Sequence, residues 1–233
     1  MVLSSTQQLL NLNLVPEYTF TNFYCKDSVL LDLLKNIASQ HNPEPQVVVW
    51  GLHSSGKTHL LQATCQMALS TERRAIYLPL AECLLHSPDC FEDLQQMDVV
   101  CLDDLHLITN QPIWEQAVFD LINQLRANQT SLVISSQLAP GNDLFSLADL
   151  SSRSVWGPVY KIDSLDEKDL MPAMQCQAQA RGLTLGVELF EYMLTHYPRD
   201  IQHLVMMLEK LSQASLQQQR KITIPFIKQV CPL

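Results

Sequence analysis

The sequence lacks the features of a secreted, membrane-spanning or disulfide-rich protein. Its seven cysteines form no C-x-x-C pair, so they give neither a zinc-site spacing nor an evident disulfide framework. No charge-free run reaches the length of a membrane span, and no basic segment precedes Lys26 to mark a signal peptide. We therefore expect a globular cytoplasmic protein with reduced thiols and no membrane contact.

Positive charge is also scarce. The 233 residues carry 15 Lys and Arg against 24 Asp and Glu, a net charge of −9. Residues 1–164 hold 8 of these cations and 17 of the acids, while residues 165–233 hold 7 of each. A strongly basic surface is the usual requirement for gripping DNA. We therefore expect no direct sequence-specific DNA binding.

Short apolar runs alternate with helix-length segments over the first two thirds of the chain. The helices expected are Ser28–Gln40, Thr58–Leu69 and Trp114–Ala127, the last with Asn110 as a cap and Pro112 in its first turn. The expected strands are Val47–Trp50, Ala75–Leu78, Val99–Leu102, Leu132–Ile134 and Val159–Ile162. This alternation predicts an α/β fold with a five-stranded parallel sheet flanked by helices.

After Ile162 the pattern predicts helices alone. A capping box at Ser164–Glu167 opens a helix that runs to about Arg181, and Val187–Thr195 and Asp200–Ser215 follow. We therefore expect a flexible tail over residues 1–16, an α/β nucleotide-binding domain over 17–164 and a small all-α lid domain over 165–233.

The segment "GLHSSGKTH", between the first expected strand and the next helix, has the pattern of a phosphate-binding loop. Glycines at Gly51 and Gly56 let backbone N–H groups turn inward, and the helix N-terminus adds a favourable dipole. Lys57 is expected to reach the β- and γ-phosphates, and the Thr58 hydroxyl to bind Mg²⁺. The other residues placed in the nucleotide site are Ser54, Ser55 and His59.

An acidic partner follows the third strand in "VVCLDD". Asp103 is expected on the Mg²⁺ side, and Asp104 in a catalytic role that orients an attacking water. His106 is interpreted as a surface or packing histidine rather than a ligand, and Trp114 and Trp156 are assigned to packing. The two motifs predict nucleotide binding, but they do not by themselves predict hydrolysis.

Five quoted stretches together resemble the AAA+ ATPases of the DnaA type, over roughly residues 17–233: "GLHSSGKTHLL", "VVCLDDLHLI", "SLVISSQLAP", "LSSRSVWGPVYKI" and "RDIQHLVMMLEKL". The match is best with regulatory members that lack the initiator's DNA-binding domain. The resemblance implies a protein that holds ADP or ATP with Mg²⁺, attaches to the DNA polymerase sliding clamp and provokes hydrolysis of ATP on the DnaA initiator, which prevents re-initiation. A homodimer is compatible with it.

The same resemblance implies roles for residues outside the two motifs. Arg153 in "SSRSVWG" matches the family's arginine finger, which acts on the nucleotide of a neighbouring subunit. The tail segment "QQLLNL" lies in register with the clamp-binding hexapeptide, with Gln7, Leu10 and Leu12 at its anchor positions. Because the family's sites are completed by a neighbour's arginine, we expect weak hydrolysis by the isolated chain.

Two positions depart from the family pattern. Ser136-Gln137 stands where a small residue and aspartate form a polar sensor, and Gln202 replaces a sensor arginine on a lid helix. A neutral amide cannot neutralise phosphate charge, so Arg199 is a candidate substitute. The resemblance places the nucleobase between the segment around Phe20 and Phe23 and the lid near Ile201, although both aromatics could equally be core residues.

Two other functions remain open. One is an autonomous AAA+ ATPase such as a DnaA-related helicase loader, for which we expect a basic extension that binds single-stranded DNA. The other is a non-catalytic scaffold that uses its nucleotide only to fix a conformation, for which we expect loss of Lys57 or Asp103. The sequence has no such extension, and both residues are present.

Overall fold

The five predicted strands form one parallel sheet in the order β2-β3-β4-β1-β5. The computed structural model describes residues 14–25, 28–39, 45–141 and 144–232. The strands are β1 (Gln46–Trp50), β2 (Ala75–Pro79), β3 (Val99–Asp103), β4 (Ser131–Ser136) and β5 (Val159–Lys161). The central strands β3 and β4 are buried along their whole length, as expected for a sheet with both faces covered. The predicted fold class is confirmed.

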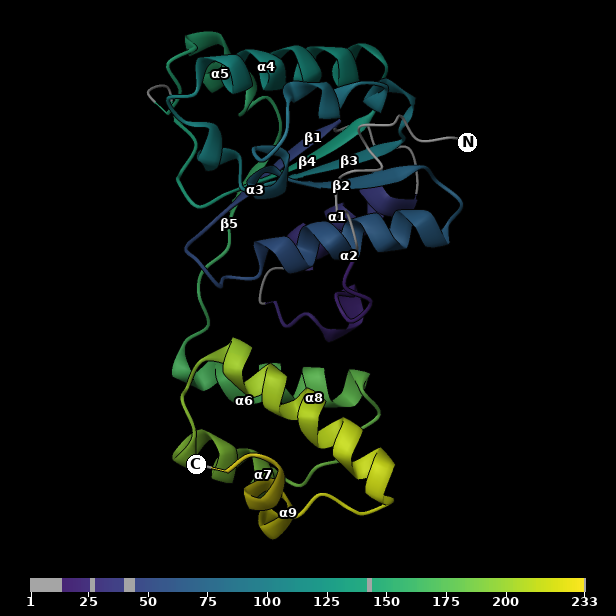
Figure 1. Ribbon diagram of the computed structural model, residues 1–233, viewed down its shortest axis with the longest axis vertical. Helices are drawn as coiled ribbons and strands as arrows, with labels where there is room; N and C mark the ends of the chain where they lie inside the picture. The colour runs from purple at the N-terminus through teal and green to yellow at the C-terminus, as the bar shows by residue number, and fades with distance from the viewer. Residues whose placement is uncertain (1–13, 26–27, 40–44, 142–143, 233) are drawn as a thin grey trace. The chain divides into compact units, whose positions relative to one another are not determined.

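Helices cover both faces of this sheet (Figure 1). One face carries α1 (Ser28–Ser39) and α2 (Lys57–Ser70), and the other carries α4 (Pro112–Ala127) and α5 (Ala148–Arg153). Side chains alternate along each strand, so Val48, Val100 and Ile134 pack into the core beneath α4. The intervening residues point to the α2 side. Short connecting helices complete this unit: α3 (Leu80–Cys83), η3 (Pro88–Phe91), η4 (Leu94–Gln96) and η5 (Leu105–Ile108).

A second compact unit begins at Leu165 and also takes in a short segment that starts at Thr21. Its core gathers buried residues such as Met193, Leu208 and Phe226. The helices are α6 (Glu167–Ala180), α7 (Val187–His196), α8 (Ile201–Gln218) and α9 (Ile224–Val230), with η2 (Phe20–Asn22) at the boundary. The helix α9 escaped prediction because it has only seven residues and contains a proline in its first turn.

Two predicted helix caps are wrong. Asn110 does not cap α4: its backbone is left-handed, with φ of 62°, and Gln111 occupies the cap position. The side chain of Glu115 instead accepts a hydrogen bond from the Asn110 N–H at 2.9 Å. The capping box of α6 lies two residues later than predicted, with Asp166 as the cap and Asp169 as its reciprocal partner. Both errors arise because several polar residues near a helix start could serve as the cap.

Among the described residues, no helix is both long and apolar enough to cross a membrane.

Candidate nucleotide-binding site

The loop between β1 and α2 has the backbone of an anion cradle. Ser54 and Gly56 are left-handed, with φ of 62° and 95°, and Gly56 caps α2 without a side-chain bond. A Cβ atom at Gly51 would lie 2.2 Å from the carbonyl oxygen of Ile162, so only glycine fits there. The turn therefore presents the free N–H groups at the start of α2 to one point, the geometry that binds phosphate.

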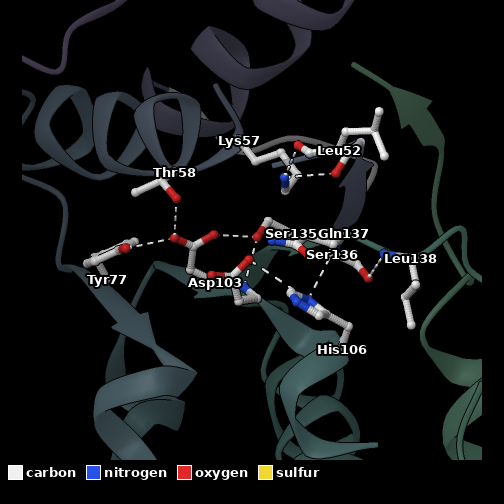
Figure 2. A network of polar contacts seen from close by, with 12 residues as sticks. Leu52, Lys57, Thr58, Tyr77, Asp103, His106, Ser135, Ser136, Gln137 and Leu138 are labelled. Carbon is white, nitrogen blue, oxygen red and sulfur yellow. Dashed lines mark hydrogen bonds and ion pairs between the residues drawn. The ribbon is translucent and has the colours of Figure 1, made fainter. Parts of the chain in front are cut away.

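Lys57 places its ammonium group inside this loop. The side chain is 5% exposed, and Nζ donates hydrogen bonds to the carbonyl oxygens of Gly51 and Leu52 at 2.9 and 2.8 Å (Figure 2). Burial lowers the pKa of Lys57, while the charges of Asp104 and Asp103 oppose that shift. The loop thus holds the Lys57 ammonium group next to the N–H groups of the cradle.

Ser55 adds a further polar group to the loop. Its hydroxyl oxygen is buried and has no hydrogen-bond partner among the described residues. A buried hydroxyl without a partner is costly, and an oxygen-rich ligand in the cradle would satisfy it. His59 points elsewhere: its ring stacks on Tyr18 with 4.7 Å between centroids, and its Nε2 lies 2.8 Å from the Thr19 carbonyl oxygen.

Asp103 is the centre of a polar network at the end of β3 (Figure 2). Its Oδ2 accepts hydrogen bonds from Thr58 Oγ1 at 2.8 Å and from the Tyr77 hydroxyl at 2.7 Å. Its Oδ1 accepts one from the Ser135 hydroxyl. The carboxylate is 2% exposed, and three donors hold it in one orientation beside the start of α2.

Tyr77 and Ser135 were not identified from the sequence, yet the sheet brings both to Asp103. Strand β3 lies between β2 and β4, with Leu102 paired to Leu78 on one side and to Ile134 on the other. Because side chains alternate, Tyr77, Asp103 and Ser135 all point to the α2 face. The strand order would have been enough to identify both residues. Tyr77 and Ser135 are adjacent to the core residues Leu78 and Ile134, so they point to the opposite face of the sheet, as Asp103 does.

Replacing Tyr77 by phenylalanine should lower the free energy of unfolding by about 1–3 kcal/mol, because one hydrogen bond to a buried carboxylate is lost. Urea denaturation measures this change. The matched control is Tyr160→Phe on the edge strand β5, which should cost less than about 0.5 kcal/mol. Equal stability of Tyr77→Phe and the wild type would remove Tyr77 from the network.

Asp104 follows in a left-handed conformation, with φ of 60°. Its backbone N–H donates to the Ser135 hydroxyl oxygen at 2.8 Å, so a single serine holds both aspartates. Burial, and next the charge of Asp103, raise the pKa of Asp104. A carboxylate with a raised proton affinity beside a phosphate loop is suited to orient or deprotonate a water.

The expected sensor pair lies at the end of β4, next to these aspartates. The Gln137 N–H donates to His106 Nδ1 at 3.2 Å, and Leu138 N–H donates to Ser136 Oγ at 3.1 Å. His106 Nδ1 also lies 3.8 Å from Asp104 Oδ1, but this nitrogen already accepts the hydrogen bond from the Gln137 N–H. Burial lowers the pKa of His106, and the charge of Asp104 opposes that shift.

A magnesium ion fits the donors at this point. Thr58 Oγ1 and the carboxylate of Asp103 are hard oxygen ligands only 2.8 Å apart. The described residues contain no group of three or more His, Cys, Asp or Glu that could enclose a metal by itself. Mg²⁺ is commonly held by one or two protein ligands plus phosphates and water, which matches this arrangement.

The lid residues predicted to contact nucleotide are found within the second unit. Arg199 donates to Glu167 at 2.7 Å and to the Leu194 carbonyl oxygen at 3.1 Å, so its guanidinium is held by the lid itself. Ile201 begins α8 and packs against the lid core. Gln202 is exposed on the first turn of α8. The predicted clamp anchors Gln7, Leu10 and Leu12 lie outside the described residues.

Arg153 is the last residue of α5, and it forms no ion pair with another described residue. The guanidinium carbon lies 4.1 Å from the ring centroid of Trp156 and 5.0 Å from that of Phe119. The assignment of Trp156 to packing is wrong, because 40% of its surface is exposed. Trp114 does pack as predicted, with 8% exposure and an edge contact to Phe91.

The fold and the site together define a AAA+ module with a phosphate-binding loop and a helical lid. A family model described as the bacterial DnaA ATPase domain matches residues 14–161, and one described as the lid domain of Hda matches residues 166–231. The chain therefore belongs to the DnaA family of AAA+ proteins, and within it to the Hda type. This is a family of replication-initiation regulators.

Individual relatives agree with this placement. A Haemophilus influenzae protein described only as uncharacterized is 38% identical over 222 residues, which cover 94% of this chain and 95% of that one. Domain III of the Thermotoga maritima replication initiation protein DnaA has a TM-score of 0.75 at 20% identity, covering 94% of this chain and 97% of that chain. AMPPCP-bound DnaA from Aquifex aeolicus has a TM-score of 0.70 at 20% identity, covering 88% and 68%. These structures share the fold.

Proposed function

We propose that this chain is a nucleotide-dependent regulator that stimulates hydrolysis of ATP bound to the DnaA initiator and thereby limits re-initiation. The observation that carries the proposal is the phosphate-loop network of Lys57, Thr58 and Asp103, joined in one chain to a lid of the Hda type. The layout follows the sequence: a clamp-binding tail over residues 1–16, a nucleotide domain over 17–164 and a lid over 165–233.

The nucleotide in this proposal is ADP or ATP with Mg²⁺. A DnaA of the same fold has been described with the ATP analogue AMPPCP, which supports an adenine nucleotide here. The N–H groups of the loop and the Lys57 ammonium hold the phosphates, while Thr58 and Asp103 hold the metal. When bound, Mg²⁺ neutralises phosphate charge. Asp103 is oriented by its three hydrogen-bond donors, which supports a preformed site in this chain.

The partner's reaction requires a cation from this chain. We assign that role to Arg153, whose guanidinium contacts two aromatic rings and, within the part of the chain that the structure describes, no carboxylate. An arginine delivered across a subunit interface neutralises charge on the phosphoryl group during transfer. The same logic keeps hydrolysis by the isolated chain weak, because its own site lacks a neighbour's arginine, which a homodimer or the initiator could supply.

The sliding clamp is the second proposed partner. Gln7, Leu10 and Leu12 match three anchor positions of a clamp-binding peptide, and leucines of an extended tail can bind in an apolar groove. Replacing Gln7 by alanine should weaken capture by immobilised clamp about tenfold, the effect of losing a well-placed hydrogen bond at an interface. Gln8→Ala is the matched control, because Gln8 stands where the peptide has leucine. Equal capture of both variants by the clamp would contradict this assignment.

Reconstitution tests the function as a whole. The purified chain, ADP, clamp-loaded DNA and a DnaA initiator carrying labelled ATP are combined, and conversion of the bound ATP to ADP is followed. We expect rapid conversion only when the clamp, the DNA and this chain are all present. An autonomous ATPase would instead hydrolyse free ATP without initiator, and an unstimulated initiator would refute the proposal.

A further inference from the structure

A second arginine shares the aromatic ring that supports Arg153. The guanidinium carbon of Arg126 lies 4.0 Å from the ring centroid of Trp156, and that of Arg153 lies 4.1 Å from the same centroid. The family motifs assign no role to Arg126 or to Trp156. Two cations therefore gather on one half-exposed indole ring, in a unit whose charged residues are mostly acidic.

The scaffold around this ring is rigid. Phe119 and Arg126 are seven residues apart on α4, two helical turns, so both lie on the same face of that helix. Gln46, which is 5% exposed at the start of β1, donates from Nε2 to the carbonyl oxygens of Arg153 and Ser154 at 2.9 and 3.1 Å. The segment that carries Arg153 is thus bonded to the central sheet.

Gly157 shows how close this approach is. A Cβ atom at that position would lie 1.7 Å from the carbonyl oxygen of Gln46, so any other residue would push the segment away from β1. The backbone on both sides of Trp156 is consequently fixed. The indole is a platform that is positioned by main-chain contacts and not by burial of the ring itself.

Among the described residues, the two arginines on this platform have no acidic counter-ion. No ion pair joins Arg126 or Arg153 to an acidic side chain within the described parts of the chain, and two like charges on one ring repel each other. A cation over an exposed indole gains only about 0.5–1 kcal/mol, so the stacking does not consume the capacity of either guanidinium to bind an anion. Each retains planar N–H donors that can bind phosphate oxygens bidentately.

We propose that Trp156 is a positioning residue that holds Arg153 and Arg126 together as a paired cationic site for the γ-phosphate end of the nucleotide bound to the partner subunit. Arg126 is the second cation of this site. The inference rests on the proposed function, because it takes Arg153 to act across the interface. It adds a residue on α4 that contacts the same phosphate chain and an aromatic ring that sets the geometry of both.

Binding to the initiator tests the role of Arg126. Affinity for initiator loaded with AMPPCP or with ADP is measured for the wild type, Arg126→Gln, Arg126→Lys and the control Lys35→Gln, which removes an exposed cation on α1. Arg126→Gln should weaken binding to the AMPPCP form about tenfold and to the ADP form by less than about twofold, because a charge pair at an interface is lost only when the γ-phosphate is present. Arg126→Lys should restore only part of the affinity, because an ammonium group keeps the charge but cannot bind phosphate bidentately.

Stimulated hydrolysis tests the role of Trp156. Trp156→Leu, which fills space without a π face, should lower the maximal stimulated rate about tenfold, since a misplaced catalytic group costs up to about a hundredfold. Trp156→Phe should restore most of that rate. The concentration of this chain that gives half-maximal stimulation should change less than the maximal rate in both variants.

Four outcomes would overturn the inference. If Arg126→Gln binds the initiator as tightly as Lys35→Gln while Arg153→Ala still abolishes stimulation, the proposed function stands and Arg126 is excluded. Equal weakening with the AMPPCP and ADP forms would place Arg126 against a surface carboxylate of the partner. Equal rates for Trp156→Leu and Trp156→Phe would reduce the ring to filling space. A wild type without stimulation would refute the proposed function together with this extension.

Discussion

Replacing Arg153 by alanine should reduce stimulated hydrolysis of initiator-bound ATP by about 10³- to 10⁵-fold, the range seen for arginine fingers supplied in trans. The reason is electrostatic: charge develops on the phosphoryl oxygens during transfer, and Arg126, the proposed second cation of the site, is not expected to take the place of the Arg153 guanidinium. Rates are measured in the reconstituted system with the initiator, clamp-loaded DNA and ADP.

The same variant should keep its own nucleotide. Arg153 lies at the end of α5, whereas the phosphate loop begins α2, so the dissociation constant for ADP should change less than about twofold. Arg74→Ala is the matched control, because Arg74 is an exposed arginine that pairs with Asp98 at 3.2 Å. Its loss should leave stimulation intact. Undiminished stimulation by Arg153→Ala would exclude the arginine from the mechanism.

Replacing Lys57 by alanine should weaken binding of ADP and ATP by about tenfold to a few hundredfold. One charge-assisted hydrogen bond to phosphate contributes about 1.5–3 kcal/mol, and each 1.4 kcal/mol is a factor of ten in affinity. Lys57 is the only cation in the loop, and its neighbours Asp103 and Asp104 repel phosphate once it is removed. Isothermal titration calorimetry in Mg²⁺ buffer measures the change.

Two measurements separate lost phosphate contact from damage to the loop. Lys57 donates to the Gly51 and Leu52 carbonyl oxygens, so the variant should also be less stable without nucleotide, by about 1–3 kcal/mol in urea denaturation. Lys35→Ala is the control for both measurements and should change neither. An unaltered dissociation constant in Lys57→Ala would overturn the assignment of the phosphate loop.

The strand and helix pattern of the nucleotide domain could be predicted because hydrophobic periodicity and phosphate-loop spacing are local properties. All five strands and the helix after the loop lie at the positions predicted from the sequence, for example around Val47 and from Lys57 onward. Helix caps were less predictable: Asp166 displaced Ser164 because a run of polar residues offers several equivalent starts. Trp156 was misassigned because burial depends on neighbours distant in the sequence.

The sequence alone determined the chemistry available at the site: a lysine and threonine on a glycine loop, and two aspartates after an apolar strand. Only the tertiary structure decided which groups join them, since Tyr77 and Ser135 reach Asp103 through a strand order that no local pattern encodes. The same holds for Arg126 and Arg153, which are 27 positions apart and meet on one ring. Local spacing determines which chemical groups a segment offers. The packing of segments distant in the sequence determines which other groups those groups contact.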